Sequence, residues 1–314
     1  MLALKLVSYR QKGDSAPFRT GILSDGKVFD VQDSYRKLLY AREEDLIASI
    51  ETFLPADPNE FFSLGKDAIE RAQSAFDYIV QDRSGDFVSF STDQVNLGVP
   101  IPNPGKIICV GQNYADHVAE MNSKLPDHPV LFAKFSNALI GPEDHIQKSP
   151  LTNQLDYEVE LVIVIGKEAT QIKKENALDY IAGYTIGNDT SARDLQKRTP
   201  QWLQGKSHDN STPIGPYIVT ADEITDPENL GIRAFVNGEK RQESTTQHLI
   251  FDLPTLITFI SDLITLQPGD IIFTGTPHGV GAGMNPPQFL NAGDVVTLEI
   301  DEIGTLENRV QDRV

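Results

Sequence analysis

The sequence predicts an α+β protein in which a small α/β amino-terminal domain, residues 1–100, precedes a mostly β domain, residues 105–314. Three observations predict this division. Helical patterns lie in the first hundred residues, short strand-like segments separated by turns recur after them, and a proline-rich linker, residues 99–105, stands between. Many short strands with few helices are typical of a roll or barrel, so the second domain is expected to have that form.

The first hundred residues are expected to form strands at 2–9 and 20–31, followed by two helices. The second strand region reads as a hairpin that turns at Ser24-Asp25-Gly26. Apolar residues then recur at helical spacing, which predicts amphipathic helices. The residues that carry this spacing are Leu46, Ile47, Ile50 and Phe53 in the first helix and Ile69, Ala72, Phe76 and Ile79 in the second.

After the linker, strand-like segments alternate with turns, and one clear helix interrupts them. The helix is expected over residues 253–265, with Asp252 as its N-cap. Asn237-Gly238 is a strong signal for a tight hairpin turn. The segments expected to be strands are residues 106–110, 130–134, 158–165, 181–186, 218–220, 232–236, 271–274 and 295–300.

Composition restricts the partners of this chain of 314 residues. A formal net charge of −18 argues against nucleic acid and against anionic membranes. The chain has a single cysteine, Cys109, and this count excludes internal disulfides and thiolate zinc clusters. Because Cys109 lies in an apolar run, its thiol is expected to be buried and inert. The chain shows no signal-peptide core and no stretch long enough to span a bilayer, so we expect a cytoplasmic protein.

Two carboxylates stand where a buried strand should be apolar. Glu158 and Glu160 begin the segment 158–165, which is otherwise apolar and β-branched. Side chains two apart on a strand share a face, so these carboxylates point the same way and repel each other in a low-dielectric setting. A divalent cation would remove that repulsion, and oxygen ligands favour Mg²⁺, Mn²⁺ or Ca²⁺. The alternative is an edge strand whose acidic end is solvated.

A third carboxylate follows the strand-like segment 181–186. Asp189 begins a stretch that we expect to be helical, and Arg193 and Gln196 then lie at i+4 and i+7 on the same helix face. Asp189 would supply a third oxygen ligand, with Arg193 and Gln196 as donors to a carboxylate or carbonyl. The alternative is a capping aspartate with an ordinary helical ion pair.

Further candidate residues lie before and after these carboxylates. His117 and Glu120 are three apart on a short helix, so the glutamate can orient the imidazole as a base, although such pairs are common on surfaces. Residues 121–129 have the composition of a lid. Lys206 could hold a substrate carboxylate or an enolate, or be a solvated surface lysine. Thr276 could donate to a ligand from a glycine-rich loop that matches no nucleotide-binding pattern.

Taken in order, these motifs resemble the fumarylacetoacetate hydrolase family over residues 105–314. Residues 281–290 and the tail resemble its diketo-acid hydrolase or acylpyruvase-like branch, and the amino-terminal region resembles the smaller appended domain of longer members. The segments that carry the resemblance are 110–117, 156–161, 183–184, 188–196, 205–207, 236–239 and 268–277.

The resemblance implies a β-roll catalytic domain, a homodimer, and a site that binds Mg²⁺ or Mn²⁺ and a small anionic 2-oxo or 2,4-dioxo acid. It implies that Glu158, Glu160 and Asp189 hold the metal and that His117 and Glu120 form a catalytic dyad on the lid. It adds Lys206 as a catalytic residue. The positions that it assigns to substrate binding are Arg193, Gln196, Thr276 and Tyr114.

We therefore expect a metal-dependent hydrolase that cleaves a C–C bond in a 2,4-dioxo acid such as an acylpyruvate, fumarylpyruvate or a fumarylacetoacetate-like compound. In that reaction His117 deprotonates the attacking water and a metal-bound enolate leaves. The same site could instead serve oxaloacetate decarboxylation or tautomerisation. An alternative of another class is a non-catalytic dimeric scaffold that uses the metal for folding.

Overall fold

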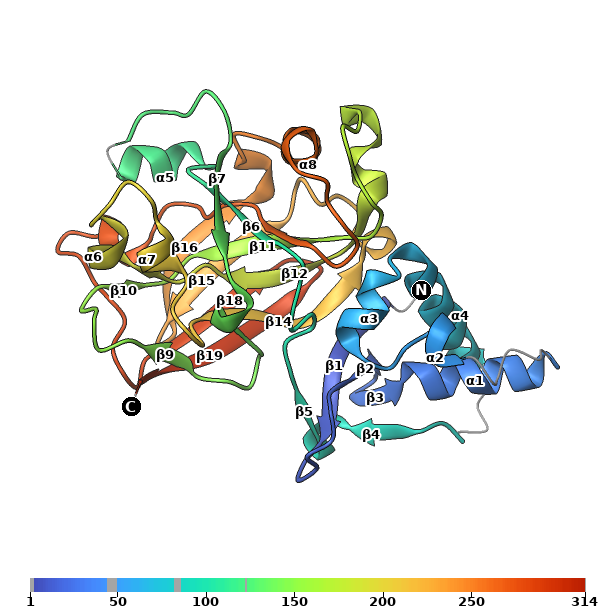
Figure 1. The fold of residues 1–314 in the computed structure, drawn as a ribbon. Coiled ribbons are helices and arrows are strands. Elements are labelled where there is room, and N and C mark those ends of the chain that lie inside the picture. Colours follow the sequence, from blue (N-terminus) through green and yellow to red (C-terminus); the bar gives the residue numbers. More distant parts are fainter. Residues whose placement is uncertain (1–2, 44–49, 82–85, 122, 314) are drawn as a thin grey trace.

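The computed structural model describes residues 3–43, 50–81, 86–121 and 123–313, and it confirms the predicted α+β class (Figure 1). A twelve-stranded sheet runs through the molecule. In spatial order its main path is β4 (Ser89–Ser91), β3 (Lys27–Asp30), β2 (Arg19–Ser24), β1 (Lys5–Gln11), β14 (Thr212–Thr220), β12 (Ile181–Asn188), β11 (Val159–Ile165), β17 (Ile271–Phe273), β6 (Ile107–Gly111) and β7 (Val130–Lys134), with β5 (Val95–Leu97) on β1 and β8 (Leu139–Ile140) on β14.

A smaller sheet of five strands packs against the central part of the large one. Its order is β16 (Glu239–Thr245), β15 (Gly231–Val236), β18 (Val295–Ile300), β19 (Gly304–Asp312) and β9 (Ile146–Lys148). A two-stranded ladder joins β10 (Leu155–Asp156) to β13 (Ser191–Ala192). The α-helices are α1 (Val31–Ala41), α2 (Ile50–Phe53), α3 (Pro58–Ser63), α4 (Lys66–Gln81), α5 (Ala115–Glu120), α6 (Arg193–Gln196), α7 (Leu203–Lys206) and α8 (Leu253–Leu263).

The amino-terminal hairpin forms as predicted, but its second strand ends earlier. Asp25 and Gly26 both have positive φ, 48° and 72°, as a two-residue hairpin turn requires. The strand prediction that extended to Val31 is wrong at its end, since α1 begins there. The side chain of Asp30 accepts a hydrogen bond from the backbone N–H of Asp33 and thereby caps this helix, which the periodicity did not predict.

The two helices predicted next have different outcomes. Helix α4 contains the whole of the second apolar set, with Ala72 and Phe76 on its buried side. The first set lies partly outside the described residues, because Leu46 and Ile47 belong to the segment 44–49. Its remaining members lie in the short helix α2.

The amino-terminal strands extend the same sheet that carries the site. Strand β1 pairs antiparallel with β14, with Leu6 opposite Ile218. Figure 1 shows the amino-terminal elements on one side of the molecule, joined to the larger body along this strand pair. Backbone hydrogen bonds therefore cross the predicted division between residues 1–100 and 105–314, and that division stays a prediction.

Strand β14 is longer than the sequence indicates. The expected strand covered residues 218–220, whereas β14 begins at Thr212 and includes the proline-rich stretch before it. Its first residues pair with β8, with Pro213 opposite Ile140. The register against β12 shifts between Tyr184, which lies opposite Val219, and Ile186, which lies opposite Gly215, so the pairing is irregular beside this stretch.

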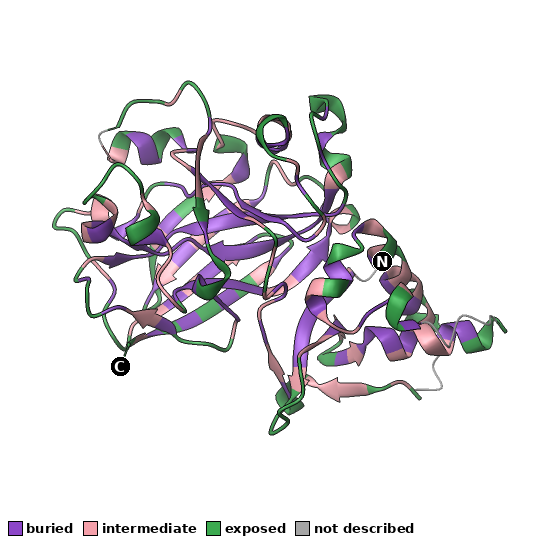
Figure 2. Cartoon of the chain, viewed as in Figure 1, coloured by how far each residue is buried: buried purple, intermediate pink, exposed green. Residues whose placement is uncertain are grey.

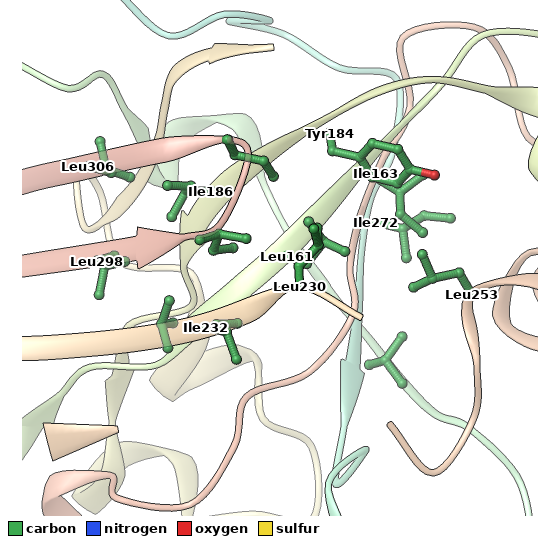
Figure 3. Packing of buried hydrophobic residues seen from close by; sticks show 14 of the residues in the cluster. Leu161, Ile163, Tyr184, Ile186, Leu230, Ile232, Leu253, Ile272, Leu298 and Leu306 are labelled. Atoms are coloured by element: carbon green, nitrogen blue, oxygen red, sulfur yellow. The ribbon is translucent and has the colours of Figure 1, made fainter. Parts of the chain in front are cut away.

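The main core lies between the two sheets and under α8. Figure 2 shows the buried residues concentrated in the central strands, and Figure 3 shows how side chains from several strands meet there. Leu161 and Ile163 of β11 are fully buried, and each such side chain contributes roughly 1.5–3 kcal/mol to folding. Every residue of β11 is buried, so a carboxylate at its start is in a dry environment.

Two local predictions in the carboxyl-terminal half are confirmed. Asn237 and Gly238 form the turn between β15 and β16, with φ of 53° and 79°. The side chain of Asp252 accepts a hydrogen bond from the backbone N–H of Thr255 and caps α8. Among the residues that the structure describes, no helix combines the length and the apolar character needed to cross a bilayer.

Candidate active site

The pairing of β11 with β12 brings three acidic side chains together. Val159 lies opposite Asn188, so the start of β11 meets the end of β12. Glu158, Glu160 and Asp189 each place one carboxylate oxygen within 4.8 Å of the others. All three side chains are buried, with exposed fractions of 4%, 2% and 1%. The solvated edge-strand alternative for the two glutamates is therefore excluded by their burial.

Cations surround two of these carboxylates. The Lys206 ammonium lies 2.7 Å from Glu158 Oε2 and 2.6 Å from Asp189 Oδ2. Arg193 Nη2 lies 2.6 Å from Glu158 Oε1. The Lys134 ammonium lies 2.8 Å from Asp189 Oδ1. Burial alone would raise the pKa of Glu158, but the attraction of Lys206 and Arg193 outweighs it and lowers the pKa.

Glu160 has a different environment. No described lysine, arginine or histidine lies within 4.0 Å of its carboxylate, which accepts one hydrogen bond, from the Gly275 backbone N–H at 2.8 Å. Burial, followed by repulsion from Asp189 and Glu158, raises its pKa well above the usual range. Such a carboxylate lacks a positive partner, which a divalent cation would supply.

The donor set fits Mg²⁺ or Mn²⁺. The buried group contains four carboxylates, with Asp156 added to the three above, and three cations, so one negative charge remains. All the candidate ligand atoms are carboxylate oxygens, which these hard cations prefer. The residues present therefore suit a divalent cation at Glu158, Glu160 and Asp189.

The helix predicted to carry Asp189, Arg193 and Gln196 does not form over that span. Residues 191–192 form β13, which pairs with β10, and α6 begins only at Arg193. The helical pattern of the sequence is not realised here, because the backbone groups of residues 191–192 pair with strand β10. Asp189 consequently reaches the site from the end of β12. Arg193 and Gln196 remain neighbours, since Arg193 Nη1 donates to Gln196 Oε1 at 3.1 Å.

Helix α5 carries the expected histidine and glutamate pair. His117 Nδ1 lies 3.3 Å from Glu120 Oε2, and His117 is buried rather than on the surface. Glu120 Oε1 accepts a hydrogen bond from the Gly279 backbone N–H at 2.9 Å, so the glycine-rich loop fixes the glutamate. Figure 1 shows α5, α6 and α7 along one rim of the molecule.

A pocket of about 320 Å³ joins these groups. His117, Arg193, Gln196, Lys206 and Thr276 line it together with the three carboxylates. Thr276 Oγ1 accepts a hydrogen bond from Gln242 Nε2 at 2.8 Å.

Tyr114 differs from the other candidates, because it is not among the residues that line the pocket. Its hydroxyl is buried and has no hydrogen-bond partner among the described residues. Burial, followed by the nearby negative charge of Glu160, raises the pKa of Tyr114.

Sequence reasoning assigned no role to two buried charges at the site. Asp156 is fully buried and accepts hydrogen bonds from Arg193 Nε at 2.8 Å and from the backbone N–H groups of Gly281 and Ala282 at 2.7 and 3.0 Å. Lys134 is the second such charge. The one feature of the sequence that could have identified it is its position at the end of an otherwise apolar strand. Asp156 stands two residues before Glu158 in the acidic segment, and this spacing is the signal that could have identified it.

Comparison with known proteins finds relatives over the residues that form this pocket. The family described as Fumarylacetoacetate (FAA) hydrolase C-terminal matches residues 106–311. The chain is 42% identical over 313 residues to a Xenopus laevis protein named oxaloacetate tautomerase fahd2, mitochondrial, covering 98% of this chain and 91% of that protein. It is 42% identical over 295 residues to oxaloacetate tautomerase YisK of Bacillus subtilis, covering 92% and 94% of the two chains.

Solved structures of similar proteins have the same fold. Fumarylacetoacetate hydrolase (EaFAH) from Exiguobacterium antarcticum matches with a TM-score of 0.75 at 36% identity, covering 99% of this chain and 100% of that one. Maleylpyruvate hydrolase from Sphingobium sp. SYK-6, in complex with manganese(II) and pyruvate, matches with a TM-score of 0.75 at 27% identity and the same coverage.

Proposed function

The chain belongs to the fumarylacetoacetate hydrolase family, and from this premise we propose that it interconverts the keto and enol forms of oxaloacetate. The observation that carries the proposal is one pocket that is lined both by His117, whose Nδ1 contacts Glu120, and by a buried set of three carboxylates. The names of the two relatives at 42% identity favour this reaction over the C–C hydrolysis expected first. From the sequence alone, tautomerisation, together with decarboxylation of oxaloacetate, was the alternative to that hydrolysis.

Glu158, Glu160 and Asp189 would hold Mg²⁺ or Mn²⁺ in this proposal. The bound cation would act as a Lewis acid that stabilises negative charge on the oxygen of the substrate carbonyl. A Mn²⁺ complex in the Sphingobium structure supports a divalent cation in this fold.

The protein groups suit the two proton transfers of a tautomerisation. The contact of His117 Nδ1 with Glu120 leaves Nε2 without a partner among the described residues, so Nε2 can accept the proton that leaves C3. The C2–C3 bond becomes double as the C3–H bond breaks, and the C2 oxygen then receives a proton. Lys206 lies beside the carboxylates, where its charge can stabilise the developing enolate.

The second candidate is hydrolysis of a C–C bond in a 2,4-dioxo acid. The structural similarity to maleylpyruvate hydrolase, whose complex contains pyruvate, favours it specifically. In that reaction His117 would deprotonate water, which attacks the distal carbonyl. Tautomerisation needs no attacking water, so the two reactions share the pocket and differ in what the base deprotonates. The scaffold alternative is disfavoured, because the relatives named above are enzymes.

The deciding experiment follows three reactions of the purified protein with Mn²⁺, each with an EDTA control. The assays are enol–keto relaxation of oxaloacetate by its ultraviolet absorbance, pyruvate release from oxaloacetate, and pyruvate release from acetylpyruvate. Accelerated relaxation without pyruvate is expected. Faster cleavage of acetylpyruvate would reassign the protein as a hydrolase, and pyruvate from oxaloacetate alone would make it a decarboxylase. Inactivity in all three assays would favour the scaffold.

A further inference from the structure

We propose that Lys197 binds the distal carboxylate of the substrate and so selects dicarboxylic 2-oxo acids over monocarboxylic ones. The inference rests on the proposed function, because it specifies the substrate class of the same pocket. Lys197 follows the last residue of α6 and lines the pocket, and its side chain is exposed. It has no part in the carboxylate cluster described above.

Lys197 differs from Arg193 and Lys206, the other two Lys or Arg side chains of the pocket, in that it forms no ion pair with a described carboxylate. Arg193 and Lys206 each contact two carboxylates at 2.8 Å or less. Lys197 has no carboxylate within 4.0 Å in the described part of the chain, although the protein carries a net charge of −18. A lysine that lines a pocket without an acidic partner is available to an anionic ligand.

Charge balance across the pocket favours a dianion. Three carboxylates, those of Glu158, Glu160 and Asp189, line the pocket, and three cations, Arg193, Lys197 and Lys206, balance them. A divalent cation at the carboxylates would leave an excess of two positive charges. A substrate with two carboxylates offsets that excess completely, whereas a monocarboxylate leaves one positive charge.

The backbone places Lys197 at a fixed point of the pocket wall. The Lys197 N–H donates to the Arg193 carbonyl at 3.2 Å, and the Arg193 side chain is in turn held by Asp156 and Glu158. The backbone of Lys197 is therefore bonded to a turn of α6 that the ion pairs of Arg193 hold in place. Val118, Met121 and Phe132 form an apolar part of the lining and cannot bind a carboxylate, so the charged end of the ligand is expected on the Lys197 side.

The test compares ligands that differ only in the distal group. Binding of malate and of 2-hydroxybutyrate to the Mn²⁺-loaded protein is measured by calorimetry, and the KM and kcat for oxaloacetate are measured in parallel. We expect Lys197→Met to raise the Kd for malate and the KM for oxaloacetate by about tenfold, because a charge-assisted contact is lost. The Kd for 2-hydroxybutyrate and the kcat should change by less than about twofold.

Two control variants make the result specific. Lys197→Arg keeps the charge and should retain most of the discrimination, while Lys173→Met removes an exposed lysine elsewhere and should change nothing. Equal weakening of both ligands, or of neither, in Lys197→Met would overturn the inference. A wild-type protein that binds malate selectively but does not tautomerise oxaloacetate would refute the proposed function and leave the role of Lys197 supported.

Discussion

His117 acts in the proposed reaction through its ring nitrogen opposite Glu120. We expect His117→Asn to lower kcat for tautomerisation by about 10²–10⁴-fold, the usual contribution of a positioned general base. Mn²⁺ binding should survive, because the residue is not among the three carboxylates. Stopped-flow relaxation of oxaloacetate measures the rate, and calorimetry measures Mn²⁺ binding. Normal turnover in this variant would exclude His117 as the base.

Glu160 is the carboxylate whose charge the protein leaves unpaired. We expect Glu160→Gln to raise the melting temperature in EDTA, since the variant removes repulsion from Glu158 and Asp189. Mn²⁺ at 100 times its Kd should stabilise the wild type by about 2.7 kcal/mol, which raises the melting temperature by about 4 °C for a chain of this size. The variant should show no such shift. An equal Mn²⁺ shift in both proteins would place the metal elsewhere.

Asp156 connects Arg193 to the loop that also holds Glu120. Its carboxylate accepts hydrogen bonds from Arg193 and from two backbone N–H groups of that loop. We expect Asp156→Asn to weaken Mn²⁺ affinity or activity by about 10- to 100-fold, the usual cost of losing a residue that orients metal ligands. Calorimetry and the relaxation assay measure the two quantities. Asp194→Asn is a matched control, because Asp194 lies next to Arg193 in α6 but accepts its hydrogen bond from the Thr152 hydroxyl.

At the scale of elements, the cap of α8 shows what a local signal contributes. Asp252→Ala should lower the free energy of unfolding by about 1 kcal/mol, whereas Asp252→Asn should retain most of the cap. Burial opposes ionisation of Asp252, but hydrogen bonds from Lys174 and Thr255 outweigh it and lower its pKa. Because the folded-state pKa lies below the ordinary 3.8, the stabilisation by the charged form is present above pH 3.8 and is lost as the pH falls through the folded-state value.

Urea unfolding of the three proteins at pH 7 and below pH 3.8 measures this contribution. The difference between wild type and Asp252→Ala should decrease in acid. A difference that stays constant with pH would mean that the carboxylate charge does not contribute to the cap.

At the scale of the whole molecule, the amino-terminal part and the catalytic part share one sheet and one of the cores. Leu6 and Phe76 belong to the same buried cluster as Val164 and Phe273 of the central strands. We expect a chain restricted to residues 105–314 to aggregate or to melt well below the full protein, because it exposes both this cluster and the edge of β14. Thermal melting and light scattering measure this. Equal stability would support the division predicted from the linker. The homodimer implied by the family also stays a prediction.

The sequence by itself determined the features that depend on neighbours a few residues apart. The convergence of Glu160 in β11 with Glu158 directly before it, the Asn237-Gly238 turn and the Asp252 cap were all predictable, because extended-chain periodicity, turn conformation and capping are local. The fold class and the family followed from the same local patterns taken in order.

Only the tertiary structure decided which distant residues meet. Asp189 joins Glu158 through the pairing of two strands, and the Gly279 N–H reaches Glu120 from a loop 159 residues away. The expected helix at Asp189 gave way to β13 because backbone pairing with β10 outweighed local propensity. The contact of Lys134 with Asp189 and the sheet that continues across the linker could not be predicted for the same reason. Both depend on long-range pairing, which the packing of the whole chain decides and local sequence does not.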